Sequence, residues 1–265
     1  MTYTRDYSDM QLYFDEKLAD EYKSLSQKIR VLTEDWVNKQ IYCPNCGHPI
    51  HRYPNNKPVA DFFCSHCQED YELKSKKNSI GARIMGGAYK TMIERLNSTN
   101  NPNLFLLNYN PHDFSVLNFF VIPKHFFVPS IIEKRKPLSQ IARRSGWTGC
   151  NILLSNIPEI GRIFLVRNKI VEPKEKVITK WKKTLFLREE KESSVRGWLL
   201  DIMYCIEKIG CKDFSLSDMY RFESELAKKY PNNYHFHSLS PSVPHPLDMK
   251  WRLHQYRHLL LALLY

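Results

Sequence analysis

Two pairs of cysteines restrict the folds open to this chain more than any other sequence feature. Cys43 and Cys46 form one Cys-X-X-Cys unit, Cys64 and Cys67 form a second, and 17 residues lie between the two units. This spacing is typical of a zinc site made of four thiolates. Because four thiolates fill the tetrahedral shell of Zn²⁺, we expect a structural ion with no open position for substrate. The alternative is four unrelated cysteines.

The other metal-binding residue types do not form a second set with such spacing. His48, His51 and His66 lie close enough along the chain to replace a cysteine as ligands, but a complete set of thiolates predicts that they are surface residues. Three further cysteines are predicted to be small buried or half-buried side chains: Cys150, Cys205 and Cys211.

Charge and targeting signals set the outer limits of function. The first residues have no apolar core of a signal peptide, and the closing run LLLALLY is too short to span a bilayer. We therefore expect a soluble cytoplasmic protein, in a compartment where thiols stay reduced. We also expect it to be a monomer in solution. The formal net charge of +11 favours a polyanionic partner, with nucleic acid as the first candidate. Charge alone is equally compatible with a solvated basic surface that has no partner.

A coarse reading of the pattern predicts a mixed α/β fold. Apolar residues at helical spacing predict a helix over residues 15–40, leading into the first cysteine pair. A glycine-rich turn that opens a helix is expected over 77–97. Strands are expected at 104–109, 116–122 and 162–167. The charged segment 172–194 is expected to mark the boundary to a smaller C-terminal unit.

Residues 60–76, ADFFCSHCQEDYELKSK, combine the second cysteine pair with a charged hairpin. Side chains alternate along a strand, so Glu72 and Lys74 share one face. If the hairpin is symmetric about the cysteine pair, Asp61 lies opposite Glu72 and Val59 lies opposite Lys74. Two facing carboxylates repel each other unless a cation lies between them.

This pattern predicts a magnesium site, because Mg²⁺ prefers carboxylate and water oxygens. Asp61 and Glu72 would hold the ion, while Lys74 would orient an attacking water and stabilise charge on a phosphate. The expected chemistry is phosphodiester hydrolysis. A slip of one residue would move Glu72 and Lys74 to the wrong face, so we expect the zinc site to act as a clamp on the register. The alternative is an ordinary charged hairpin face.

Five stretches resemble one family of enzymes, in order, over about residues 15–230: LTEDWVNKQIYCPNCG, PVADFFCSHCQEDYELKSKK, ARRSGWTGCNI, GRIFLV and DMYRFESEL. They are similar to the DpnI family of methyl-directed restriction endonucleases. The resemblance implies a PD-(D/E)xK catalytic domain with a structural zinc, followed by a winged-helix domain. It also implies cleavage of duplex DNA at GATC sites whose adenine is methylated. Matching the motifs makes Asp61 and Glu72 the magnesium ligands and Lys74 the catalytic lysine. The four paired cysteines take the zinc positions.

The loop QIARRSGWTGC carries the candidate residues for DNA recognition. Arg143 and Arg144 can bind phosphates or guanine edges, and Trp147 can supply apolar contact for a methyl group in the major groove. The resemblance supports this role for the loop. From the sequence alone, Trp147 is as compatible with a place in the core.

The C-terminal part is expected to begin a winged helix but not to complete a regular one. Helices are predicted at 194–210 and 215–230, the second opened by a capping box from Ser215 and Asp218. A recognition helix and a basic wing should follow, yet the tail from about residue 231 is rich in His and Pro and is diverged or rebuilt. We therefore expect a catalytic domain at 1–188 and a winged-helix-like domain at 189–265.

Taken together, these features predict a magnesium-dependent endonuclease with a structural zinc that hydrolyses adenine-methylated duplex DNA. Two alternatives belong to another functional class. One is a noncatalytic, zinc-stabilised reader of methylated DNA, and the other is a zinc-ribbon or winged-helix transcription regulator. Neither alternative needs opposed carboxylates beside a polyanion, so the acidic pair favours the enzyme.

Overall fold

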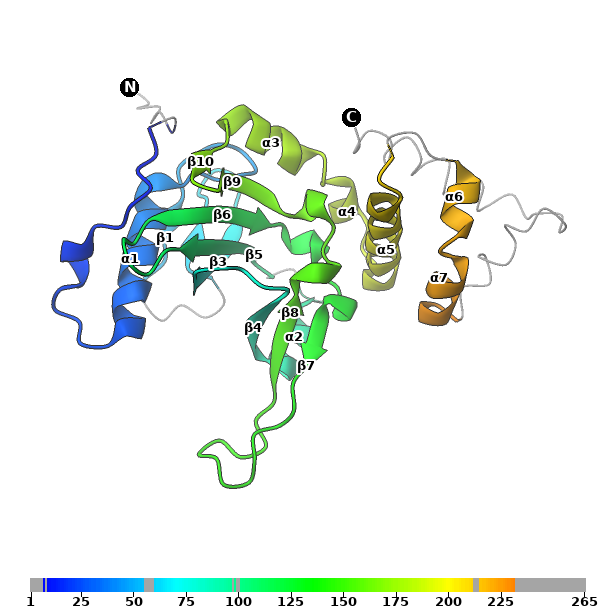
Figure 1. Cartoon of the computed structure of the whole chain (residues 1–265), viewed down its shortest axis with the longest axis horizontal. Helices are drawn as coiled ribbons and strands as arrows, with labels where there is room; N and C mark the ends of the chain where they lie inside the picture. Colours follow the sequence, from blue (N-terminus) through cyan, green and yellow to red (C-terminus); the bar gives the residue numbers. More distant parts are fainter. Residues whose placement is uncertain are drawn as a thin grey trace, which may run out of the picture.

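The computed structural model describes residues 7, 9–54, 60–96, 98, 101–211 and 215–231. The chain forms a mixed α/β fold, as predicted, with one large sheet, one small sheet and a helical C-terminal part (Figure 1). The large sheet has seven strands in the order β1-β2-β3-β5-β6-β9-β10, and the small one has three in the order β4-β8-β7.

The strands of the large sheet are β1 (His51–Arg52), β2 (Phe62–Phe63), β3 (Asp70–Lys77), β5 (Asn103–Tyr109), β6 (Val116–Ile122), β9 (Ile163–Arg167) and β10 (Ile170–Val171). The small sheet consists of β4 (Arg83–Ala88), β7 (Ile132–Lys134) and β8 (Gly149–Leu153). The α-helices are α1 (Leu25–Gln40), α2 (Tyr89–Leu96), α3 (Lys174–Lys182), α4 (Phe186–Glu189), α5 (Ser193–Ile209), α6 (Leu216–Tyr220) and α7 (Glu223–Lys229). Short 3₁₀ helices are η1 (Glu16–Ala19), η2 (Lys124–Phe126), η3 (Pro129–Ile131), η4 (Leu154–Asn156) and η5 (Glu159–Gly161).

Strand β5 lies in the middle of the large sheet and is buried along its whole length. It pairs in parallel with β3 and antiparallel with β6, and a continuous apolar sequence suits a strand covered on both faces. The strands predicted at 104–109, 116–122 and 162–167 are thereby confirmed as β5, β6 and β9.

Alternation along β5 divides the buried residues into two cores, one on each face of the large sheet. Phe105 and Leu107 belong to the core that includes Trp36 of α1 and Trp181 of α3. On the opposite face, Leu104 and Leu106 belong to a second core with residues of the small sheet and of α5. Figure 1 shows α1 and α3 apart from the small sheet, consistent with this division. The second face also carries Glu72 and Lys74 of β3, two of the residues predicted to be catalytic.

The helix predicted over residues 15–40 is wrong at its start. Residues 16–19 form η1, and α1 begins only at Leu25, after an extended Ser24 with φ −84° and ψ 124°. Burial explains the break: Phe14 and Ala19 are anchored in the core, and the Phe14 amide donates to the carbonyl of Phe114 at 3.2 Å.

The glycine-rich turn predicted before α2 is also wrong, since its residues form strand β4. A Cβ at Gly86 would lie 2.5 Å from the sulfur of Cys150 on β8, so glycine is required for this close approach of the two strands. The pairing of β4 with β8 shifts register between Met85 and Ala88, which marks a bulge at the glycines.

The C-terminal helices follow the prediction in part. α5 agrees with the expected helix, and the predicted capping box at Ser215 and Asp218 is confirmed. The second expected helix is divided into α6 and α7 at residues 221–222. The diverged tail, with the expected recognition helix and wing, lies outside the described residues. Within the described part of the chain, no helix has the length and apolar character needed to cross a membrane.

Candidate metal centre and catalytic hairpin

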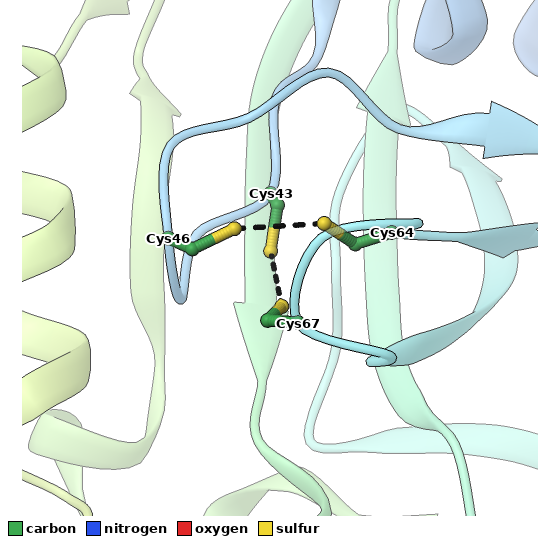
Figure 2. A group of neighbouring side chains, drawn as sticks. All are labelled: Cys43, Cys46, Cys64 and Cys67. Atoms are coloured by element: carbon green, nitrogen blue, oxygen red, sulfur yellow. Dashed lines mark hydrogen bonds between the residues drawn. The ribbon is translucent and has the colours of Figure 1, made fainter.

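The four paired cysteines converge on one point, as the spacing predicted (Figure 2). Cys43 and Cys67 place their sulfurs 3.4 Å apart, and Cys46 and Cys64 place theirs 3.5 Å apart. All four sulfurs lie within 4.8 Å of one another. A tetrahedral zinc with Zn–S bonds of about 2.3 Å requires S···S distances of about 3.8 Å. The cluster therefore fits a closed zinc site in both ligand chemistry and size.

Two tight backbone turns hold the ligands, and we name them the first cysteine turn (residues 43–48) and the second cysteine turn (residues 64–69). In the first, the Gly47 amide donates to the Cys43 carbonyl at 2.7 Å, and in the second the Gln68 amide donates to the Cys64 carbonyl at 3.0 Å. Gly47 has φ +76°, and a Cβ there would lie 2.7 Å from Cε of Lys174. Glycine adopts this left-handed backbone without strain, and its lack of a side chain leaves room for Lys174 and Ile178 of α3. Gln68 has the same conformation in the second turn, with φ 61°.

The thiols of the cluster influence one another before any metal binds. A hydrogen bond from Cys43 lowers the pKa of Cys67 to about 5. The same contact, reinforced by burial, raises the pKa of Cys43. A thiolate is the form that ligates metal.

Tyr71 connects the cysteine cluster to β3, a link that the sequence did not reveal. Its hydroxyl lies 3.0 Å from the sulfur of Cys43, and its ring stacks on Phe105 with centroids 4.3 Å apart and planes 4° apart. Tyr71 is fully buried and immediately precedes Glu72. The cluster thus contacts the strand that carries the predicted catalytic residues, one position away from them.

The register of the hairpin agrees with the predicted symmetry. Phe62 pairs with Tyr71 and Phe63 pairs with Asp70, the register in which Asp61 would lie opposite Glu72. The pairing ends at Phe62, and the Asp61 amide donates to the Tyr71 carbonyl, so the pairing of Asp61 with Glu72 stays a prediction. The other predicted pair includes Val59, which lies outside the described residues. On the other edge of β3, Glu72 and Lys74 pair with Leu104 and Leu106 of β5. They therefore face the small sheet.

Asp61 is held rigidly at the entrance to β2. Its Oδ2 accepts a hydrogen bond from the Leu73 amide at 2.7 Å, and its own amide donates to the Tyr71 carbonyl at 2.9 Å. Burial raises the pKa of Asp61 above its ordinary value, and the negative charges of Glu34 and Glu72 raise it further, against the opposing Leu73 hydrogen bond. The influence of Glu72 shows that the two predicted carboxylates share one electrostatic environment, which a cation would relieve.

Lys74 and Glu72 form a short ion pair, with Nζ 2.6 Å from Oε1. Both side chains are partly buried, with 22% and 29% of their surface exposed. The structure thus places Glu72 and Lys74 in contact, with Asp61 near enough for the charge of Glu72 to act on it. Their chemical roles stay a prediction.

A third carboxylate, Glu34 of α1, was missed by the sequence reasoning. Its side chain is 7% exposed and is ion-paired with Arg30 at 2.6 Å and with Arg52. The signal was a charged residue on the buried face of an amphipathic helix, but its proximity to Asp61 depends on tertiary packing.

The small sheet lies beside the charged residues of β3. Burial raises the pKa of the Cys150 thiol on β8, and the nearest charges that act on it include Lys74 and Glu72. Strands β7 and β8 continue into a long loop that projects away from the body of the molecule at the bottom of Figure 1. We call residues 132–153 the basic hairpin, because this segment contains Lys134, Arg135, Lys136, Arg143 and Arg144.

The three predicted DNA-reading residues all lie in the loop of the basic hairpin. Arg143 and Arg144 are exposed, and the Arg144 guanidinium lies over the Trp147 ring, 4.7 Å from its centroid. Trp147 is half-buried against Gly149, where a Cβ would lie 2.9 Å from the ring. It is not a member of either hydrophobic core. The alternative prediction of a core tryptophan is therefore wrong, while its contact with DNA stays a prediction.

Comparison with known protein families identifies both parts of the chain. Residues 10–190 match the family described as DpnI, Dam-replacing family. Residues 194–238 match the domain described as DpnI_C, Dam-replacing HTH domain. The first match includes the cysteine cluster, the hairpin formed by β2 and β3, and the basic hairpin.

Replacing Tyr71 by Phe removes the hydroxyl that contacts Cys43 and leaves the ring stacking on Phe105. We expect the affinity for zinc to fall about 10-fold or more and the free energy of unfolding to fall by about 1 kcal/mol. Zinc competition with a chromogenic chelator and thermal unfolding measure the two effects.

Tyr42→Phe is the matched control for Tyr71→Phe. Tyr42 is 1% exposed, and its hydroxyl has no hydrogen-bond partner among the described residues. Its loss removes no hydrogen bond, so it should lower neither the affinity for zinc nor the free energy of unfolding. If both variants bound zinc with the same affinity and had the same free energy of unfolding, a specific link between Tyr71 and the cluster would be contradicted.

Replacing Asp61 by Asn removes a partly desolvated charge, and the amide oxygen of Asn can still accept from Leu73. Because the folded-state pKa of Asp61 is raised, its ionised form destabilises the metal-free protein above that pKa, and protonation relieves the penalty as the pH falls. At neutral pH we expect the melting temperature of the metal-free variant to exceed that of the natural protein by about 2 °C. The difference should shrink as the pH is lowered through the raised pKa.

Asp20→Asn, at an exposed position, should leave the melting temperature unchanged at every pH. A destabilised Asp61→Asn protein at neutral pH would show that the ionised carboxylate is stabilising in the metal-free state and that our electrostatic account is wrong.

Proposed function

Because the chain belongs to the DpnI family of Dam-replacing proteins, we propose that it is a Mg²⁺-dependent restriction endonuclease that cuts duplex DNA at GATC sites containing N6-methyladenine. Family membership indicates a restriction endonuclease, a hydrolase that acts on DNA, and the matched helix-turn-helix domain indicates DNA binding. The methylation requirement, the site and the metal are the finer parts of the proposal. The proposal rests on the hairpin of β2 and β3, where Glu72 forms an ion pair with Lys74 and its charge also acts on Asp61.

Asp61 and Glu72 are the residues that would hold Mg²⁺. Both offer carboxylate oxygens, and the charge of Glu72 adds to the effect of burial in raising the pKa of Asp61, a repulsion that a cation would relieve. When bound, the ion would supply Lewis-acid polarisation of the phosphate and a more acidic water. The arrangement is that of the PD-(D/E)xK type.

Lys74 is the residue that would act on the attacking water. Its ammonium, now 2.6 Å from Glu72, can hold a water in line with the phosphorus and stabilise charge on the phosphate oxygens. The water oxygen forms a bond to phosphorus as the bond to the 3′-oxygen breaks, and the proton lost by the water balances the one gained by the leaving oxygen. The products are a 5′-phosphate and a 3′-hydroxyl.

The basic hairpin would bind the DNA next to this site. Its exposed arginines, Arg143 and Arg144, can pair with phosphates or guanine edges. Trp147, outside both cores and covered by Arg144, is suited to contact the methyl group of the modified adenine in the major groove. We assign residues 1–188 to the catalytic unit and 189–265 to a second, winged-helix-like DNA-binding unit.

The decisive experiment incubates the protein and Mg²⁺ with two preparations of one plasmid that differ only in adenine methylation at GATC. We expect cleavage of the methylated plasmid alone and a loss of at least about 100-fold in Asp61→Asn, a variant expected to stay folded. Methyl-selective binding without cleavage would instead establish a noncatalytic reader.

The Trp147→Ala variant tests the readout in the same assay. It should cut methylated DNA more slowly and lose much of its preference over unmethylated DNA, whereas Tyr13→Ala, at another exposed aromatic residue, should change neither. A Trp147→Ala protein with the full methylation preference would contradict the assignment of Trp147.

A further inference from the structure

We propose that His48 and His66, together with the Cys46 thiolate, form a second metal site on the outer side of the cysteine cluster, suited to Zn²⁺ or another imidazole-binding transition ion. The ligand atoms of these three residues lie within 4.8 Å of one another. The proposal is independent of the nuclease function, because it concerns residues on the cysteine turns only.

The two imidazoles are already side by side. Their ring centroids are 3.7 Å apart and their planes differ by 8°. Both side chains are exposed, while Cys46 is half-buried beneath them. A hydrated ion can therefore reach the imidazole nitrogens from solvent and keep water in its remaining coordination positions.

The backbone of the cysteine turns fixes this pairing. The carbonyl of His48 accepts from the Cys43 amide at 2.8 Å, which closes the first cysteine turn. His66 sits between Cys64 and Cys67 in the second turn, whose ends are joined by a 2.9 Å hydrogen bond from the Cys64 amide to the Glu69 carbonyl. The same turns that present four thiolates inward thus hold one imidazole each on the outside. An ion between the imidazoles would cross-link the two turns.

Ligand chemistry defines which ions fit. Imidazole and thiolate favour Zn²⁺, Ni²⁺ and copper, and they disfavour the hard Mg²⁺ ion. A thiolate bound to one metal retains lone pairs, so Cys46 can bridge the inner ion and the outer one. Because the four cysteines already complete the inner shell, the histidines are not needed there. With two histidines, a shared thiolate and water, the outer ion should be bound more weakly and exchange faster than the inner one.

The test measures bound zinc per chain at a series of buffered free-zinc concentrations. All proteins carry Asp61→Asn, so that the carboxylate pair contributes little to the signal. At high free zinc, the His48→Ala and His66→Ala variants should each bind one equivalent fewer than the parent and keep the tight first equivalent. His51→Ala, at an exposed histidine outside the cluster, should match the parent.

Two results would overturn the proposal. Identical titrations for all four proteins would show that no ion binds between His48 and His66. Loss of the tight first equivalent in the histidine variants would show that they belong to the inner site. As a second readout, the imidazole ring signals of His48 and His66 in ¹H–¹⁵N spectra should shift together during the weaker binding step and stay unchanged during the tight one. Ring signals that do not shift during the weaker step would contradict the proposal.

Discussion

The contact between the Tyr71 hydroxyl and the Cys43 sulfur, 3.0 Å long and fully buried, is the interaction on which the rest of the site depends. A β-hairpin as short as β2 and β3 has few ladder hydrogen bonds to set its register, and a one-residue slip reverses the face of every side chain. The cysteine cluster lies at the turn of this hairpin, and we propose that a metal there fixes which residues of β2 and β3 pair. Tyr71 transmits that constraint to the position next to Glu72. Glu69, at the end of the second cysteine turn, also holds this turn against the rest of the fold. Its side chain is buried, with 4% exposed, and accepts a hydrogen bond from Asn103 at 2.8 Å. It also forms ion pairs with Lys124, at 3.3 Å, and with Arg188 of α4.

The division of the large sheet into two faces places the proposed catalytic residues of β3 on the face that packs against the small sheet. The face packed on α1 and α3 supplies a large apolar core, and the opposite face is shared between a second core and the charged group of Asp61, Glu72 and Lys74. The small sheet closes over that second face and carries the basic hairpin. A nuclease needs a negative site for its cation and a positive surface for its DNA, and these opposite charges must lie close together without neutralising each other. Here they belong to different sheets, which separates them while keeping them adjacent.

Features that depend on local spacing could be predicted from the sequence, and features that depend on packing could not. The four cysteines, the strands β5, β6 and β9, the capping box at Ser215 and the pairing of Phe62 with Tyr71 all follow from local spacing. Strand β4 was missed because its glycines resemble a turn, and only the nearness of Cys150 explains why Gly86 is needed within a strand. Tyr71 and Glu34 were also missed because their contacts depend on tertiary packing. Tyr71 contacts Cys43, which lies 28 positions away in the sequence. Glu34 acts on Asp61, which lies 27 positions away. The stacked pair of His48 and His66 also appears only once the two cysteine turns meet.

We propose that a metal in the cysteine cluster holds the hairpin of β2 and β3 in register without taking part in the reaction. The most direct measurement compares zinc-loaded protein with protein stripped of zinc by a chelator and checked by metal analysis, following both thermal unfolding and Mg²⁺-dependent cleavage of methylated plasmid. Our account predicts that melting temperature and cleavage fall together on zinc removal and return together when zinc is restored. A zinc-free protein with full cleavage and an unchanged melting curve would contradict it.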